Sequence, residues 1–442
     1  MADPSDTARK PIPWRVQGAV YGAAMFSNSS LHLYNVAVPL WTALLTKDPL
    51  IAGIVFGARH VMPMLFLIHS GAMMDRFGTR RVMLVFAGAA VLIPILYPTF
   101  PWIPALILLQ MLGGLAVMTT WIGAQSLTGS LMHGDPVYTG RLTLATRIGT
   151  VFGPTIVGVV WDLAGPWWTF SFLSLWAILT LLCTFLVPVP PKSASTKQDL
   201  APQPTTVRDV TPKLTDYLDA FRLIAIPAIG LVVVVTMLRH SGVAIQSNFY
   251  VFYLNNIGIS GTMIGILFSV LGAIGGAGAL STGWLARHFS ARRVLITAIA
   301  LGVAAISITP LIGSSGFAMD VKPVAAVFDF LGIDIDWAPI AGVFGIYVLL
   351  LAAMSVRGAT TGIAQSMEIA LIAQSAGNAQ GKGAGLRVTV GRVVAVIVPI
   401  IMGGVAKFFG LEASFYIVGG IIILILGYLA VRDFGAPEKS EN

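Results

Sequence analysis

Twelve long apolar segments constrain the fold of this chain more than any other feature of its sequence. A helix needs about 20 mostly apolar residues to cross the hydrocarbon core of a bilayer. Backbone polar groups inside lipid must find partners within the protein, and a helix satisfies them within one segment. We therefore expect an all-α membrane protein with transmembrane helices over residues 17–45, 49–73, 81–100, 102–131, 141–164, 167–189, 221–253, 259–286, 293–313, 338–369, 386–409 and 412–433.

The composition agrees with a membrane protein and excludes several other classes. Hydrophobic residues make up 56% of the chain and charged residues 10%, whereas a soluble domain has about 25% charged residues. The net charge of +8 does not indicate nucleic acid binding, because most basic residues lie in short loops between apolar segments. The one cysteine, Cys183, allows neither an intrachain disulfide nor a cysteine metal site. The sequence carries no catalytic or nucleotide-binding motif, so we expect neither enzyme activity nor a cofactor.

A polar segment divides the chain into two halves. "PVPPKSASTKQDLAPQPTTVRDVTPK" begins at Pro188 and is rich in Pro, Ser, Thr and charge, which is typical of a flexible linker. We expect a six-helix bundle over residues 1–189, a linker over 190–220 and a second six-helix bundle over 221–442.

The two halves resemble each other. "GAMMDRFGTRRVML" at Gly71 recurs as "GWLARHFSARRVLI" at Gly283, an offset of 212, and "RIGTVFGPTIVGVVWDLAG" at Arg147 recurs at Arg392 as "RVVAVIVPIIMGGVAKFFG", an offset of 245. The additional residues of the second half are expected mostly in 314–337, with a short amphipathic helix. Duplicated halves around a central site are typical of secondary transporters.

The distribution of Lys and Arg predicts the orientation. Most of the 27 basic residues fall on the side that would carry both termini, and Lys47, Lys322 and Lys407 fall at the other. Positively charged loops stay in the cytoplasm, so we expect both termini there. The sequon at Asn28 lies inside a predicted helix, which together with the single cysteine favours a bacterial inner membrane.

The loop after the second helix resembles the signature of the major facilitator superfamily. The pattern Gly-x-x-x-Asp-Arg-x-Gly-x-Arg-Arg is matched in full by "GAMMDRFGTRR". The resemblance implies two pseudo-symmetric six-helix bundles, a monomer, and transport by alternating access around a cavity lined by helices 1, 4, 7 and 10. It also implies a gating role for the charged residues of the signature, Asp75, Arg76, Arg80 and Arg81.

Five arginines lie inside predicted helices. Arg59, Arg239 and Arg357 are deep in their segments, where each charge costs about 2.5–3.5 kcal/mol on insertion scales. Only Asp162 and Glu368 approach a helix, near its end, so we expect the three deep arginines to lack a buried carboxylate partner. Arginine suits carboxylate and phosphate groups, which predicts an anionic substrate. Arg147 and Arg392 occupy equivalent positions in the two halves. They are candidates for a symmetric inner gate, or else they are packing residues.

Polar residues on the same helices complete the expected site. The resemblance makes further lining and substrate-binding candidates of Asn28, Asn35, Gln110, His240, Gln246 and Gln365, although bonds between helices would explain part of this set. Histidine titrates near neutral pH. His32, His60 and His240 are therefore candidates for proton coupling, or else buried helix residues with ordinary hydrogen bonds.

Three functions are compatible with the sequence. The first is transport of a small carboxylate-type organic anion, coupled to protons or to exchange. The second is proton-driven efflux of a drug or metabolite, because Gly153 and Pro154 belong to a pattern that resembles the helix-5 motif of drug/proton antiporters; helix packing explains the same residues. Gln110 departs from the antiporter pattern, and the first helix carries no acid. The third is an anionic-lipid flippase or a membrane scaffold.

Overall fold

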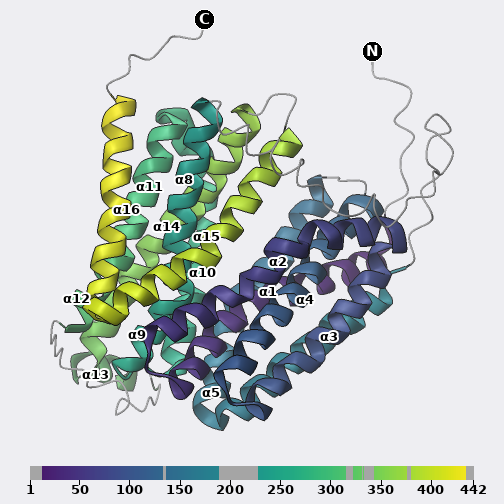
Figure 1. The fold of residues 1–442 in the computed structure, drawn as a ribbon, viewed down its shortest axis with the longest axis horizontal. Coiled ribbons are helices and arrows are strands. Elements are labelled where there is room, and N and C mark those ends of the chain that lie inside the picture. Colours follow the sequence, from purple (N-terminus) through teal and green to yellow (C-terminus); the bar gives the residue numbers. More distant parts are fainter. Residues whose placement is uncertain are drawn as a thin grey trace, which may run out of the picture.

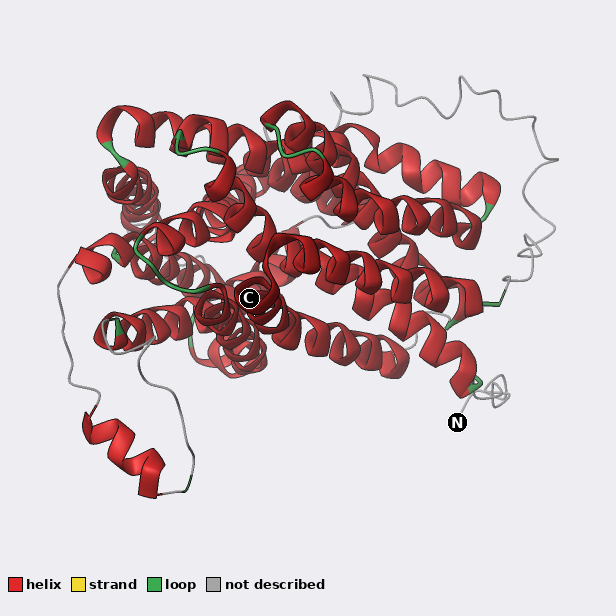
Figure 2. Cartoon of the chain, turned by 90° about the horizontal axis from the view of Figure 1, so that it is seen from below, coloured by secondary structure: helices red, strands yellow, loops and turns green. Residues whose placement is uncertain are grey.

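The structure is a computed structural model in which residues 12–132, 136–188, 227–314, 322–330, 332, 343–375 and 380–434 are described. Within these ranges the chain forms helices joined by short loops (Figure 2). This confirms the expected all-α fold. The linker predicted over 190–220 lies outside the described residues.

Five helical elements form the first half. They are α1 (Trp14–Leu45), α2 (Pro49–Phe77), α3 (Thr79–Thr99), α4 (Ile103–Leu131) and α5 (Pro136–Leu186). The backbone of α5 leaves the helical conformation at Gly165, which has φ 76°, a value that favours glycine. The backbone of Gly149 and the ring of Trp176 both contact Ser29. The two arms of α5 therefore lie side by side and supply the fifth and sixth predicted helices.

The second half repeats this arrangement. Its elements are α8 (Pro227–Ala244), η2 (Ile245–Tyr250), α9 (Val251–Asn256), α10 (Gly261–His288), α11 (Ala291–Ser307), α12 (Thr309–Ser314), α13 (Lys322–Phe330), α14 (Phe344–Ser375), α15 (Gln380–Phe409) and α16 (Leu411–Phe434). The elements α8, η2 and α9 follow one another as the seventh membrane helix, with η2 as a π-helical turn. The short α13 lies where the sequence predicts a helix.

The helices are suited to a bilayer. In the described ranges, nine helices are long and apolar enough to cross a membrane, and one of them, residues 140–186, contains both arms of α5. Figure 1 shows the two bundles side by side, the first in purple and blue and the second in teal to yellow. The chain direction places the start of α1 and the end of α16 on one face, which we call the terminal face. The opposite face is the distal face.

Two seams join the halves. The first seam packs α2 against α15, and the second packs α5 against α10. In the first seam, a Cβ on Gly53 would overlap the carbonyl of Pro399. In the second, a Cβ on Gly265 would overlap the carbonyl of Pro154. The offsets of 212 and 245 residues relate Gly53 to Gly265 and Pro154 to Pro399, so the seams are copies of one duplicated contact.

At the distal face, each seam contains a carboxylate that binds a group of the other half. In the first, Asp48 pairs with Lys407 at 2.8 Å. In the second, Asp162 accepts hydrogen bonds from the backbone N–H of Gly261 at 2.8 Å and of Thr262 at 2.7 Å. These two N–H groups open α10, where the helix dipole is positive. Lys407 and Asp162 are related by the offset of 245, so one position holds a cation in one seam and an anion in the other.

Candidate functional site

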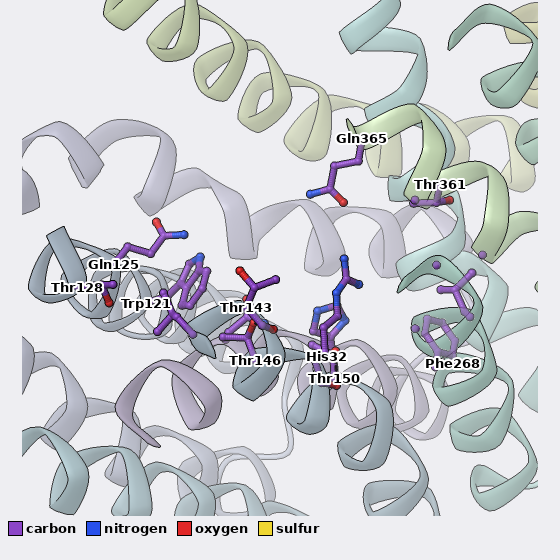
Figure 3. Close-up of a pocket in the computed structure, with 18 of the residues that line it drawn as sticks. His32, Trp121, Gln125, Thr128, Thr143, Thr146, Thr150, Phe268, Thr361 and Gln365 are labelled. Carbon is purple, nitrogen blue, oxygen red and sulfur yellow. Dashed lines mark hydrogen bonds between the residues drawn. The ribbon is translucent and has the colours of Figure 1, made fainter. Parts of the chain in front are cut away.

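A cavity of about 640 Å³ lies between the halves, within the usual range for ligand pockets of about 300–1,000 Å³. Its walls come from α1, α4, α5, α10 and α14. Figure 3 shows Trp121 and Gln125 on one side, Thr361 and Phe268 on the other, and His32 in the wall between them. The cavity therefore lies between the two bundles, where the sequence predicts a central site.

The cavity opens toward the terminal face. Its exposed lining residues include Gln125, Gly129, Thr143 and Gln365. The first three lie near the end of α4 and the start of α5, and Gln365 lies in the second half of α14, so all four point to the terminal side. The two seams close the distal side. The structure is thus open to one face of the membrane and closed to the other.

The charge of the cavity lining is positive. Arg147 lines the cavity, and none of the described lining residues is a carboxylate. Within the described part of the chain, no hydrogen bond or ion pair holds the Arg147 guanidinium. His32 is within electrostatic reach of this guanidinium. Uncharged hydrogen-bonding groups supply most of the other polar lining, from Asn28, Gln125, Thr128, Thr143, Thr146, Thr150, Thr361 and Gln365.

Arg59 lies inside the first bundle rather than in the cavity wall. Its Nη1 donates to Asn35 Oδ1 at 2.9 Å and its Nη2 to the carbonyl of Leu31 at 3.3 Å. The guanidinium carbon also sits 5.0 Å from the ring centroid of Tyr34, a favourable cation–π distance. An amide, a carbonyl and an aromatic face therefore satisfy this buried cation within its own bundle.

The ion pair of Arg239 with Glu368 contradicts the expectation that the deep arginines lack a carboxylate partner. Arg239 Nε donates to Glu368, which is fully buried and also accepts a hydrogen bond from Thr236 Oγ1 at 3.0 Å. The prediction was wrong because it placed Glu368 near a helix end, whereas α14 continues to Ser375. Glu368 therefore lies within the bundle, facing α8.

Arg357 is the least satisfied of the three. Its Nε donates to Gln246 Oε1 at 3.0 Å, while its buried Nη2 has no hydrogen-bond partner among the described residues. The guanidinium lies against Gly242 of α8 and Gly302 of α11, since a Cβ on either would come within 3.1 Å of it. Arg357 thus faces the interior of the second bundle, away from the cavity.

The other predicted lining residues separate into two groups. Asn28 and Gln365 line the cavity, and His32 is the one proton-coupling candidate that does so. The rest are engaged within the bundles. Gln110 accepts from Tyr97 Oη at 3.2 Å, and His240 Nδ1 donates to the carbonyl of Thr236 at 2.9 Å; Asn35 and Gln246 hold arginines as described above.

Arg392 connects the halves at mid-depth. Its Nη1 lies 3.4 Å from Nδ1 of His60, which accepts the hydrogen bond, and its Nη2 donates to Met118 Sδ at 3.1 Å. A residue of α15 therefore reaches across the first seam to α2 and α4. Arg147, its equivalent in the first half, lies in the cavity instead.

The signature loop lies at the terminal face. Arg80 Nη2 donates to the carbonyl of Phe185 at 2.7 Å and so ties the start of α3 to the end of α5. Arg76 and Arg81 are exposed, and the side chain of Asp75 lies outside the described residues. The gating role of this loop remains a prediction.

The helix-5 motif packs against two neighbours. A Cβ on Gly153 would overlap Leu33 of α1, and Pro154 faces Gly265 in the second seam. These contacts account for both residues through helix packing. From the sequence, Asp162 and Lys407 stand out for their positions but no contact is predicted for them, and Asp48 does not stand out, although the offset of 245 relates Asp162 to Lys407.

Comparison with known proteins identifies the family. The profile of the Major Facilitator Superfamily matches residues 20–340, and the chain belongs to this superfamily. It is 26% identical over 286 residues to proteins named "Enterobactin exporter EntS" from Citrobacter koseri and Shigella boydii serotype 4. These alignments cover 61% of this chain and 63% of each relative, less than two thirds of its length.

Solved structures show the same fold. The nucleoside transporter NupG superposes with a TM-score of 0.70 at 12% identity, covering 95% of this chain and 99% of that one. The POT family transporter PepTSo gives 0.65 at 12% identity, covering 95% and 98%. The chain is therefore a multi-pass membrane protein with the fold of the Major Facilitator Superfamily.

Proposed function

We propose that this protein moves a small carboxylate-type organic anion across the membrane by alternating access. The observation that carries the proposal is the cavity. Among the described residues, the Arg147 guanidinium that lines it has no hydrogen-bond or ion-pair partner, and no lining residue is a carboxylate. A cation in a partly buried site is costly unless an anion or water satisfies it. A bound carboxylate would supply two acceptors in the geometry that arginine favours.

The state seen here is one end of the transport cycle. The positive-inside distribution supports a cytoplasmic terminal face, so the cavity would be open to the cytoplasm. Opening the opposite side requires the two distal seams to separate. His32, which lies in the cavity wall near Arg147, is the histidine best placed to couple a proton to the anion.

Export of an anionic metabolite is a specific second candidate. It is favoured by the relatives named as enterobactin exporters. Direction is set by coupling and gradients rather than by the cavity, so the same site serves uptake or export. Efflux of cationic drugs fits less well, because the lining residues that the structure describes offer them no carboxylate.

A thermal-stability screen of the purified protein in detergent tests the proposal. A ligand that binds only the folded state stabilises it by RT ln(1 + [L]/Kd). We expect mono- or dicarboxylates at millimolar concentration to raise Tm, and lipophilic cations of similar size not to. Shifts with the cations alone would contradict the anion assignment.

A further inference from the structure

At mid-depth, the two seams differ in the residue that would face a duplicated arginine. The offset of 212 relates His60 of α2 to Gly272 of α10, and the offset of 245 relates Arg392 of α15 to Arg147 of α5. Each seam therefore has an arginine at the same place. The residue that would face this arginine is a histidine in the first seam and a glycine in the second.

In the first seam, the histidine accepts a hydrogen bond from the arginine. Arg392 donates to His60 Nδ1 at 3.4 Å and to Met118 Sδ at 3.1 Å, so both terminal nitrogens of its guanidinium are engaged. In the second seam, Gly272 offers no side chain, and Gly272 and Arg147 both line the cavity. The cavity thus lies on the side where the histidine contact is missing.

The space beside Gly272 would admit a Cβ without overlap. A Cβ built there would lie 3.5 Å from the carbonyl oxygen of Thr150 and 3.7 Å from Val151 Cγ2, which are ordinary contact distances. The glycines of the seams nearer the distal face behave differently, because a Cβ on Gly265 would overlap Pro154. Close packing therefore explains Gly265, and it does not explain Gly272.

We propose that Gly272 is a specificity-determining residue, which withholds a protein partner from Arg147 and so reserves this guanidinium for the substrate's anionic group. This inference rests on the proposed function. The difference between His60 and Gly272 would give the transporter a single anion subsite, at Arg147 in the second seam. In the first seam, His60 accepts a hydrogen bond from the equivalent arginine, Arg392.

The test transplants the first-seam residue into the second. Benzoate and succinate serve as probes, and Tm is titrated for the wild type, Gly272→Ala and Gly272→His. We expect Gly272→Ala to keep the wild-type Kd within about threefold, since the added methyl has room. We expect Gly272→His to weaken binding at least tenfold at pH 8, where a neutral imidazole accepts a hydrogen bond from Arg147.

An apolar side chain of similar size separates partnering from bulk. Gly272→Leu adds a comparable volume and no acceptor for arginine, so it should weaken anion binding less than Gly272→His does. Equal losses in the two variants would mean that the side chain only fills the space, and they would overturn the inference. If Gly272→His does not fold, Gly272→Asn supplies a smaller acceptor and should weaken binding at least threefold.

Two further outcomes are decisive. If wild-type protein responds to the probes and folded Gly272→His responds equally, the inference is wrong while the proposed function stands. If Gly272→Ala also abolishes binding, packing of α10 is responsible and the inference fails. A wild type that responds to no anion, in this test and in the wider screen, contradicts the proposed function itself.

Discussion

Gly403 of α15 faces the backbone of Pro49 of α2 so closely that a Cβ would lie 2.5 Å from the carbonyl oxygen. The related pair, Gly158 and Gly261, repeats this approach in the second seam. Backbone-to-backbone contact of this kind is how small residues bring membrane helices together without a hydrophobic driving force. The distal closure of the transporter therefore depends on the absence of a side chain at these glycines.

Gly403→Ala should weaken the closed distal side. The added methyl must displace backbone, which costs about 1–3 kcal/mol in a packed interface, and the cost falls only on the conformation in which α2 and α15 touch. Spin labels replacing the exposed Phe100 and Phe408 on the distal face, in a Cys183→Ser background, report the separation of the halves. We expect a longer distance than in the unsubstituted pair.

The neighbouring Gly404 is a matched control, because a Cβ there meets nothing within 4 Å. Gly404→Ala should leave the distance distribution unchanged. Equal behaviour of the two alanine variants would mean that the seam does not depend on close backbone approach.

Asp162→Ala should also favour distal opening. Its carboxylate caps α10 from the other half, and removing a carboxylate or hydroxyl cap costs about 1 kcal/mol, or roughly a fivefold change in an equilibrium. The same labels measure the effect. Asp329→Ala, at an exposed aspartate of α13, removes the same charge outside the seam and should have no effect. Matching shifts in both variants would contradict a specific contact.

The Asp48–Lys407 pair predicts an acid-sensitive contribution to stability. The hydrogen bond from Lys407 lowers the pKa of Asp48, and the backbone N–H of Leu50 acts in the same direction. A carboxylate with a lowered pKa stabilises the folded state above its unfolded value, about 3.9, and this stability is lost as pH falls through the folded pKa.

The Tm difference between wild type and Asp48→Asn checks this sign. It should be constant between pH 5 and 8 and shrink below about pH 4, and salt should reduce it because the pair is partly exposed. Asparagine can still cap α2, so loss of the cap is not being measured. A difference that grows on acidification would contradict the assignment.

Glu368→Gln should destabilise the second bundle. It leaves the buried Arg239 without its counter-charge, and breaking a buried pair in this way costs about 3–5 kcal/mol. We expect a lower Tm, partly restored by the double variant Arg239→Gln/Glu368→Gln. If the single variant keeps its Tm but loses transport, Glu368 has a functional role instead of a structural one.

The sequence predicts the helices, the repeat and the family because these depend on local hydrophobicity and on motifs such as the one at Gly71. The assignment of the deep arginines is harder, because it depends on the rotation of each helix about its own axis. On α14, Arg357 faces α8 and α11, whereas the next residue, Gly358, lines the cavity. The partnership of Arg239 with Glu368 needs the length and rotation of two helices at once. Apolar periodicity, which is weak in membrane helices, fixes neither.

The most direct measurement is the affinity of the stabilising anion for the wild type, Arg147→Gln and Arg147→Lys, obtained by titrating Tm. Arg76→Gln, at an exposed arginine of the signature loop, serves as the control for lost charge. If Arg147 binds the substrate, Arg147→Gln should weaken binding at least tenfold, Arg147→Lys less, and Arg76→Gln not at all. Unchanged affinity in a folded Arg147→Gln variant would contradict the anion site.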